Sequence, residues 1–449
     1  MTLVHELASS YSNPKTLSPS RALQAKAHKL IPGGAHTYAK GDDQYPAQAP
    51  AFIVRGKGCH VWDLEGKEFI EYGMGLRGVT LGHAFEPVIE AAYRQMQQGI
   101  NFTRPATIEV EAAEAFLEII AGAEMVKFAK NGSDVTTAAV KLARAFTGRD
   151  LVAICGDQPF FSTDDWFIGT TEMDAGIPHS ITRLTLKFRY NDLESLAALF
   201  DSYPDQIACV IMEAEAVTPP KPGYLKQVKE LCEQRGVLLI FDEMITGFRW
   251  HLGGAQAFHE VTPHLSTFGK AMGNGFAIAA LAGLREVMQL GGLDHDQSRV
   301  FLLSTTHGGE THALAASLET IRIYRDEDVV GALWKQGERL RALINRSIAE
   351  NRLEGIFELV GRPCNLIYAT RDQNRMPSQA FRTLFMQELI RHGIIAPSFV
   401  VSFSHSDTEI DRTAQAVHAA HIVYRRALDE GIEKYLEGRP VKPVFREYN

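Results

Sequence analysis

Ser266-Thr-Phe-Gly-Lys-Ala-Met-Gly-Asn-Gly275 is the stretch of this sequence that decides its fold, and Lys270 stands at its centre. Small residues surround the lysine, and Phe241-Asp242-Glu243 closes an apolar run fewer than thirty residues upstream. A lysine side chain has a pKa of about 10.4 and is therefore a weak nucleophile at neutral pH. It becomes reactive when it is desolvated or binds an aldehyde. Taken alone, Lys270 also suits a surface lysine before a glycine-rich turn, so its neighbours decide the interpretation.

Asp242 supplies the second part of the predicted site. It follows Val237-Leu-Leu-Ile-Phe241, a short apolar run that predicts a buried strand. Ligands of open α/β sheets bind at the carboxyl ends of the strands, and a carboxylate there can hold a pyridine nitrogen protonated. Pyridoxal phosphate needs a lysine for its aldehyde and an acid for its ring nitrogen. The pair therefore predicts this cofactor, held by Lys270 as a Schiff base. A helix N-cap or a solvated acid in a loop is the alternative role for Asp242.

Two hydroxyl-rich loops are candidates for the phosphate end of such a cofactor. Asn131-Gly132-Ser133 precedes a helix predicted over residues 134–146. Glycine allows close approach of the backbone, Ser133 offers a hydroxyl, and a helix N-terminus carries partial positive charge. An ordinary serine N-cap is the alternative for this loop. Ser304-Thr-Thr-His-Gly-Gly309 is the second candidate, and by itself it is only a turn.

The pattern of apolar residues predicts an α/β protein. Leu151–Cys155, Ile207–Met212 and Val237–Phe241 are continuous apolar runs separated by stretches of helical period. Such runs are typical of a largely parallel sheet covered by helices on both faces. At 449 residues the chain is also too long for one simple core. We expect a large cofactor-binding domain at residues 81–320 and a smaller α+β domain built from residues 1–80 and 321–449.

Local signals predict further elements. An amphipathic helix is expected around Leu225–Cys232, with Gly236 ending it. Asp63-Leu-Glu-Gly66 predicts a hairpin turn between short strands. Ser406-Asp-Thr-Glu409 is a capping box that should open a C-terminal helix, and short strands are expected within residues 357–368.

Composition and charge narrow the class of protein. The net charge is −8 and both signs are mixed along the chain, so neither a nucleic-acid stripe nor a polybasic membrane anchor is predicted. The longest apolar run, Phe276–Leu284, is too short to span a bilayer. Five widely spaced cysteines and no visible signal peptide indicate free thiols and a cytoplasmic protein. No metal site is expected, because no acidic residues accompany His307 and His312 at the spacing of metal ligands.

Taken together, the motifs resemble the class III (ω-type) aminotransferases of fold type I, which depend on pyridoxal phosphate. The similarity is strongest to the glutamate-1-semialdehyde aminomutase-like branch, and it extends from Lys29 to the C-terminal helix. The stretches that carry it are Val61-Trp-Asp-Leu-Glu-Gly-Lys-Glu-Phe-Ile-Glu-Tyr72, Gly82-His83, Lys141-Leu-Ala-Arg-Ala-Phe-Thr-Gly148, Phe241-Asp-Glu-Met-Ile-Thr-Gly-Phe-Arg249 and Phe268-Gly-Lys-Ala-Met-Gly-Asn-Gly275.

The resemblance implies roles for the residues that match the family pattern. Lys270 would form the Schiff base, and Asp242 would pair with the pyridinium nitrogen. Ile245 would pack against one face of the ring, while Gly132 and Ser133 would bind the phosphate. Thr306 matches a threonine that reaches the phosphate from the neighbouring subunit, which implies a homodimer with shared active sites. These assignments cover Lys270, Asp242, Ile245, Gly132, Ser133 and Thr306.

Several positions depart from the family pattern where the substrate binds. Phe160-Phe-Ser162 stands where the family usually has Tyr-His-Gly, and Phe160 keeps only the ability to stack on the ring. The usual Glu-Pro is Glu213-Ala214, and Lys40 aligns with an arginine that binds the substrate carboxylate. Leu76-Arg77 replaces a tryptophan near the pocket entrance. Since lysine lacks the two-pronged donor geometry of arginine, a substrate other than glutamate semialdehyde is expected.

We therefore predict an aminotransferase that moves an amino group from an amino donor to an aldehyde or ketone acceptor. A polar acceptor such as an oxidised, sugar-like biosynthetic molecule suits the changed positions, and Arg77, Glu213, Lys40 and His36 are the candidate substrate contacts. Surface or structural ion pairs are the alternative roles of these side chains. An intramolecular aminomutase is the alternative enzyme. A non-catalytic cofactor-binding protein is disfavoured, because both Lys270 and Asp242 are present.

Overall fold

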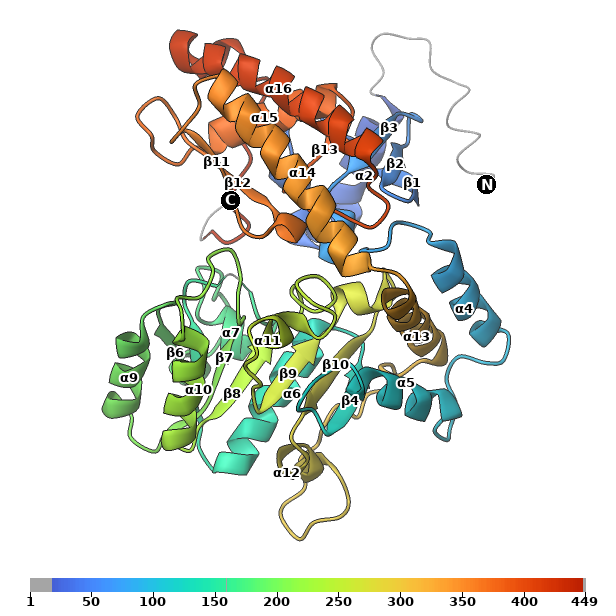
Figure 1. The fold of residues 1–449 in the computed structure, drawn as a ribbon, viewed down its shortest axis with the longest axis vertical. Coiled ribbons are helices and arrows are strands. Elements are labelled where there is room, and N and C mark those ends of the chain that lie inside the picture. Colours follow the sequence, from blue (N-terminus) through green and yellow to red (C-terminus); the bar gives the residue numbers. More distant parts are fainter. Residues whose placement is uncertain (1–17, 159, 447–449) are drawn as a thin grey trace. The chain divides into compact units, whose positions relative to one another are not determined.

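The computed structural model describes residues 18–158 and 160–446 of the chain, which form two compact units (Figure 1). The first comprises Gly82–Ala84, Lys335–Val444 and the described part of Met1–Met74. The second comprises Gly75–Leu81, Phe85–Trp334 and the described part of Phe445–Asn449. The main borders of the two units fall at residues 74/75 and 334/335, whereas the expected boundaries lie at residues 80/81 and 320/321. Residues 1–17 and 447–449, which belong to the two expected terminal segments, lie outside the described residues.

A seven-stranded sheet forms the centre of the second unit, in the order β4-β10-β9-β8-β7-β5-β6. Strand β10 is antiparallel to both of its neighbours, and the remaining pairs run parallel. The predicted α/β fold with a mostly parallel sheet is confirmed. The strands are β4 (Met125–Ala129), β5 (Leu151–Cys155), β6 (Thr185–Phe188), β7 (Ile207–Met212), β8 (Leu238–Asp242), β9 (Leu265–Phe268) and β10 (Ala279–Gly283).

Both faces of this sheet are buried, which explains the unbroken apolar runs. In β8, Leu238 and Ile240 join a hydrophobic cluster with residues of helix α6 (Gly132–Thr147). Leu239 and Phe241 point to the other face and have no exposed surface. Because successive side chains of a strand alternate between faces, a strand covered on both sides must be apolar throughout.

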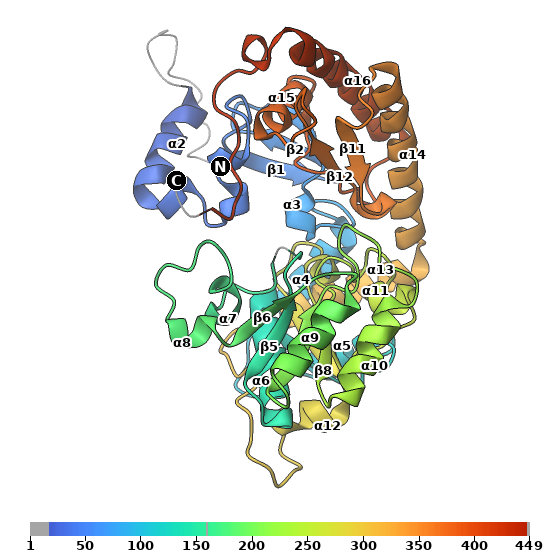
Figure 2. The same cartoon turned by 90° about the vertical axis from the view of Figure 1, so that its left-hand side faces the viewer.

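Helices cover the sheet, as Figures 1 and 2 show from two directions. Helices α9 and α10 lie side by side, and α13 packs against α4 and α5. Besides α6, the helices of this unit are α4 (Glu86–Met96), α5 (Thr107–Leu117), α7 (Asp165–Ile168), α8 (His179–Thr182), α9 (Leu193–Ser202), α10 (Tyr224–Gln234), α11 (Gly254–Phe258), α12 (Arg285–Met288) and α13 (Thr311–Asp326), with 3-10 turns η4 (Lys270–Gly273) and η5 (Gln289–Gly291).

The first unit is an α+β structure with its own core. Strands β1 (Ile53–Lys57), β2 (His60–Asp63), β3 (Glu68–Glu71) and β13 (Ile394–Ile395) form one sheet, and β11 (Phe357–Val360) pairs with β12 (Ile367–Thr370). Phe357, Tyr368 and Phe385 pack together in the core. Its helical segments are α2 (Pro19–Leu30), α15 (Gln379–Arg391), α16 (Asp407–Glu430), η1 (Pro32–Gly34), η2 (Tyr38–Lys40), η3 (Asp42–Gln44), η6 (Pro363–Asn365) and η7 (Ile432–Lys434), while α3 (Met74–Arg77) and α14 (Val329–Glu350) run across the borders between the units.

The local predictions are confirmed with small shifts. The predicted helix over 134–146 is α6, and the strand predicted over Val237–Phe241 lies one residue later, so that Asp242 is its last residue. At the hairpin, the Gly66 amide donates to the Asp63 carbonyl. Ser406 caps α16, and its own amide donates to Glu409 in return. Among the described residues, no helix is long and apolar enough to cross a membrane.

Candidate active site

A cavity of about 300 Å³ lies at the sheet edge where the parallel strands end. Its lining follows the ends of β4, β7, β8 and β9 and the start of the antiparallel strand β10. The fold therefore gathers segments that are far apart in the sequence. The lining residues are Gly75, Gly78, Lys130, Asn131, Gly132, Ser133, Phe160, Phe161, Glu213, Asp242, Met244, Lys270, Gly275, Phe276, Ala277 and Ile278.

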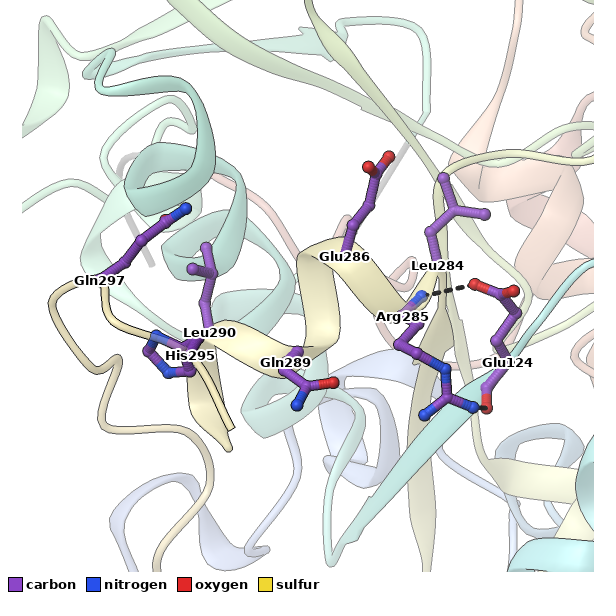
Figure 3. Close-up of a pocket in the computed structure, with 8 residues that line it drawn as sticks. All are labelled: Glu124, Leu284, Arg285, Glu286, Gln289, Leu290, His295 and Gln297. Atoms are coloured by element: carbon purple, nitrogen blue, oxygen red, sulfur yellow. Dashed lines mark hydrogen bonds between the residues drawn. The ribbon is translucent and has the colours of Figure 1, made fainter. Parts of the chain in front are cut away.

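A larger hollow of about 490 Å³ lies at the opposite edge of the same sheet, around α12 (Figure 3). There the Arg285 amide donates to Glu124 at 2.8 Å, and Leu290 lines the wall. Among the described residues its lining contains no lysine, and it lies where the parallel strands begin. Chemistry rather than size therefore identifies the smaller cavity as the site.

Asp242 is buried at the end of β8 and is oriented by two hydrogen bonds. Its Oδ1 accepts from the Met244 amide at 3.0 Å and from the Thr267 hydroxyl at 3.2 Å. Among described donors both bonds end on Oδ1, which leaves Oδ2 as the acceptor that can serve a ligand in the cavity. Burial raises the pKa of Asp242 to about 6, while the nearby Lys270 and the two hydrogen bonds oppose that rise. Asp242 is therefore a carboxylate at neutral pH.

Lys270 follows β9 and is held in a left-handed conformation, with φ of 46°. This conformation costs a non-glycine residue roughly 1–2 kcal/mol and is typical of functional positions. Burial lowers the pKa of the Lys270 amine, and the like charges of Arg77 and Arg249 act in the same direction. The carboxylates of Asp242 and Glu213 oppose this shift. A desolvated amine of this kind is a better nucleophile and base than an exposed lysine.

Glu243 is the second buried acid of the Asp-Glu pair, and its contacts are structural. Its Oε2 accepts from the Ala255 amide and its Oε1 from the Gln256 amide, both at 2.7 Å, at the start of α11. Burial raises its pKa to about 7. A side chain at Gly254 would collide with this carboxylate, since its Cβ would lie 2.4 Å from Oε2. Glu243 therefore anchors a helix, whereas Asp242 faces the cavity.

The N-terminus of α6 forms the other end of the cavity. Asp134 Oδ2 accepts from the Asn131 amide at 2.9 Å, which completes the helix cap. A Cβ at Gly132 would lie 3.0 Å from the Met244 sulfur, so glycine allows the start of the helix to pack closely beside Met244. Exposed amides at a helix N-terminus bind anions such as phosphate. Amine, carboxylate and anion-binding backbone thus surround one space, and this arrangement fits pyridoxal phosphate.

Aromatic residues line the cavity beside α6. The rings of Phe160 and Phe161 both pack edge-on against Phe167, with centroids 5.6 Å apart. The Thr136 hydroxyl of α6 donates to the Phe161 carbonyl at 2.9 Å, and Ser133 Oγ accepts from the Thr163 amide at 3.0 Å. The helix thereby fixes the segment that carries Phe160 at the cavity.

Five predicted site residues are not among those that line the cavity: Ile245, Thr306, Lys40, His36 and Arg77. His36 is exposed in the first unit. Ile245 is partly exposed, and Met244 lines the cavity in its place. Side chains two residues apart along an extended chain point the same way. Met244 therefore points to the same side as Asp242, and Ile245 to the other. Thr306 is exposed, with its carbonyl accepting from Asn101 at 2.9 Å. Lys40 is exposed in η2 of the first unit.

Of the predicted substrate contacts only Glu213 lines the cavity, but Arg77 is close enough for its charge to interact with that of Glu213. The backbone amide and carbonyl of Glu213 both bond the Gln158 side chain at 2.8 Å. Burial lowers the pKa of Arg77 to about 10, with Arg249 acting in the same direction and Glu213 opposing it. Sequence reasoning missed the positions of Met244, Lys130 and Arg249. Only Met244 carried a usable signal, the two-residue spacing from Asp242.

Glu213→Gln should flatten the dependence of stability on pH. Burial, reinforced by the Asp242 carboxylate, raises the pKa of Glu213 from its ordinary value of about 4.5 to about 8. The folded protein then holds this proton more tightly than the unfolded chain, so the free energy of unfolding should fall as pH rises from about 4.5 to about 8. Urea unfolding of the cofactor-free protein across this range measures the slope. A Glu213→Gln slope equal to that of wild type and of the exposed control Glu354→Gln would contradict the assignment.

Comparison with known proteins shows the family to which the chain belongs. The model of the family "Aminotransferase class-III" matches residues 41–399. The chain is 32% identical over 411 residues to the 3-aminobutyryl-CoA aminotransferase of Cloacimonas acidaminovorans (strain Evry), covering 89% of this chain and 96% of that protein. It is 31% identical over 426 residues to the glutamate-1-semialdehyde 2,1-aminomutase of Acetivibrio thermocellus, covering 90% and 97%.

The fold is also similar to solved structures. One is the PLP internal aldimine form of the FumI protein from Sphingopyxis sp. MTA144, with a TM-score of 0.84 and 25% identity over 92% of this chain and 97% of that one. The family model covers most of the chain, and the similarities in sequence and in structure agree with it. The chain belongs to the class-III aminotransferases, enzymes that depend on pyridoxal phosphate.

Proposed function

We propose that this aminotransferase moves an amino group from an amino donor to a polar, sugar-like aldehyde or ketone, with Lys270 and Asp242 as its catalytic residues. The observation that supports the proposal is the placement of both side chains, with the N-terminus of α6, around one cavity. When bound, pyridoxal phosphate supplies an aldehyde that takes up the amino group and a ring that accepts the electrons of a broken C–H bond.

The chain's own residues would divide the work. The α6 amides at Gly132 and Ser133 would bind the phosphate, and Met244 and Phe160 would contact the ring. Asp242 Oδ2 would hold a proton on the ring nitrogen, which makes the ring an electron sink. Lys270 Nζ, once an amine displaces it from the aldehyde, would take the proton from the donor carbon and return it as general acid. Burial favours this role because it lowers the pKa of the amine.

A screen in two halves tests this activity. The purified protein, loaded with pyridoxal phosphate, is mixed with single amines such as glutamate, alanine or 3-aminobutyrate, and loss of the visible absorption band reports amino transfer. Aldehydes and ketones, including oxidised sugars, are then added, and return of the band identifies the acceptor. We expect sustained turnover only when both an amine donor and a carbonyl acceptor are present. Sustained turnover on one added compound would instead favour the intramolecular aminomutase.

We also propose that Arg77, Glu213 and Lys40 contact the substrate, and that the enzyme is a homodimer with shared sites. Thr306 would reach the partner's phosphate site. Support for the dimer comes from the surface around Asn101, which bonds the Thr306 loop and lies between the exposed Ile100 and Phe102. Exposed apolar side chains that form a contiguous patch are typical of interfaces. The described cysteines are all free thiols, which supports a location in the cytoplasm.

Mixing two inactive variants should restore activity if the sites are shared. In a mixed dimer of Lys270→Ala and Thr306→Ala protomers, one site combines the intact Lys270 of one chain with the intact Thr306 of the other. About a quarter of the wild-type rate is expected after random mixing of equal amounts, because half of the dimers are mixed and each has one intact site. Light scattering checks the mass. A monomer, or a mixture no more active than its parts, would contradict the shared site.

A further inference from the structure

The segment Gly75–Thr80 has an unusual backbone. Gly75, Leu76 and Arg77 adopt φ values of 58°, 57° and 72° in succession. Glycine accepts such angles freely, but Leu76 and Arg77 do not, because their Cβ atoms crowd the backbone in this conformation. A run of this kind persists only where the surrounding structure holds it.

Arg249 provides much of this hold. Its side chain is fully buried, and its Nη2 donates to the Arg77 carbonyl and to the Thr80 hydroxyl, both at 3.1 Å. At the end of the segment, the Leu81 amide donates to Asn274 Oδ1 at 2.9 Å. The turn is thus fastened by residues that follow Asp242 and Lys270 in the chain, and bonds from a charged donor are stronger than neutral ones.

The fastened segment forms part of the cavity wall. Gly75 and Gly78 both line the cavity. A Cβ built on Gly78 would lie 4.0 Å from the Cα of Lys270, so the segment passes directly beside the reactive lysine. A change in this backbone would alter the space available to a substrate next to Lys270.

We propose that Arg249 is a positioning residue for substrate binding: it holds the strained turn Gly75–Thr80 as a fixed wall of the cavity beside Lys270. The proposal rests on the proposed function, because the wall matters only if Lys270 is the reacting group. Arg249 acts through the turn and does not itself line the cavity. Relaxation of the turn would move the wall and turn the Arg77 side chain away from its present position.

The charges near the turn are consistent with this role. Arg249 contributes to the lowered pKa of both Arg77 and Lys270, after burial in each case. The positive charge of the buried Arg249 guanidinium therefore disfavours protonation of the Lys270 amine. Loss of Arg249 should affect both the shape of the wall and the charge at the reacting amine.

Hydrogen exchange of the cofactor-free protein tests the hold on the turn. In Arg249→Met, the amides of residues 76–81 should exchange at least about tenfold faster, because the turn loses two bonds from a charged donor. Arg249→Lys keeps the charge on a shorter side chain, and its exchange rates at these amides should lie between those of wild type and Arg249→Met. Thr80→Val removes one acceptor with little change of shape and should give a smaller increase. Arg322→Met, an exposed arginine on α13, is the control and should leave these amides unchanged.

Kinetics with the most active donor and acceptor pair separates positioning from a general loss of structure. Arg249→Met should raise the KM of the acceptor about tenfold while changing kcat less. Leu76→Gly, added to Arg249→Met, should restore part of the affinity, since glycine adopts the left-handed conformation without strain. A merely destabilised enzyme would not regain KM by acquiring a second change.

The outcomes are distinct. Unchanged exchange at residues 76–81 in both Arg249→Met and Thr80→Val would overturn the proposal, as would an unchanged KM with a reduced kcat. If Arg249→Met does not fold, the proposal is tested by Thr80→Val alone, and unchanged exchange at residues 76–81 in that variant would overturn it. If wild type neither binds pyridoxal phosphate nor transfers amino groups, the proposed function fails. Faster exchange would then still place Arg249 as the anchor of the turn, but its role in substrate binding would fall with the function.

Discussion

Replacing Lys270 by alanine should lower the rate of transamination by about 10³-fold or more, because one side chain would serve as both cofactor anchor and proton carrier. The fold should persist, since the Lys270 side chain makes no hydrogen bond or ion pair with another described residue. Rates of both half-reactions, followed by the visible absorption band, measure the effect. Small primary amines should restore part of the proton transfer by entering the vacated space.

The matched control is Lys226→Ala on α10, where the lysine is exposed and pairs with Glu230. It should leave the rate unchanged. A Lys270→Ala enzyme that retains a tenth or more of the wild-type rate would contradict the role of Lys270, and would direct attention to Lys130, the other lysine among the described residues of the cavity lining.

Asp242→Asn should reduce kcat by about 10² to 10³-fold, the range found when a preorganised electrostatic group is removed from an active site. Asparagine keeps the size of the side chain, and its Oδ1 can still accept from Met244 and Thr267. It cannot balance a protonated ring nitrogen at any pH. At pH 7.5, above the pKa of about 6, the wild-type group carries the charge that asparagine lacks.

Glu243→Gln is the informative control for this change. The two residues are adjacent and both buried, but Glu243 bonds the start of α11. Its replacement should lower the free energy of unfolding and leave kcat of the folded enzyme within a few-fold of wild type. Equal losses of kcat in the two variants would contradict the division of labour between the neighbouring acids.

The fold could be predicted to a large extent from the sequence, because its signals are local. The runs Leu151–Cys155 and Ile207–Met212 are strands with the predicted bounds, since a strand buried on both faces must be apolar along its whole length. The site could be predicted as well. One edge of the sheet brings together Lys270, Asp242, Gly132 and the loop around Gly132. Parallel strands bring their carboxyl ends together wherever they stand in the chain.

The rest depended on contacts in three dimensions, for which the two-residue spacing of Met244 from Asp242 was the one signal in the sequence. Met244 rather than Ile245 lines the cavity, because the direction of the chain after Asp242 decides which side chain turns inward. The anchoring role of Arg249 depends on a turn formed more than a hundred and fifty residues earlier in the sequence. The expectations for Thr306 and Lys40 concern a partner chain and a second unit, and they stay predictions.

Binding of the cofactor's aldehyde by Lys270 is the step on which the proposed activity depends. The most direct measurement is to load the purified protein with pyridoxal phosphate, reduce it with borohydride, digest it and locate the modified peptide by mass spectrometry. We expect a single pyridoxyl group on Lys270, absent from Lys270→Ala treated in the same way. Modification at Lys130 or at surface lysines with none at Lys270, or no retained cofactor at all, would contradict it.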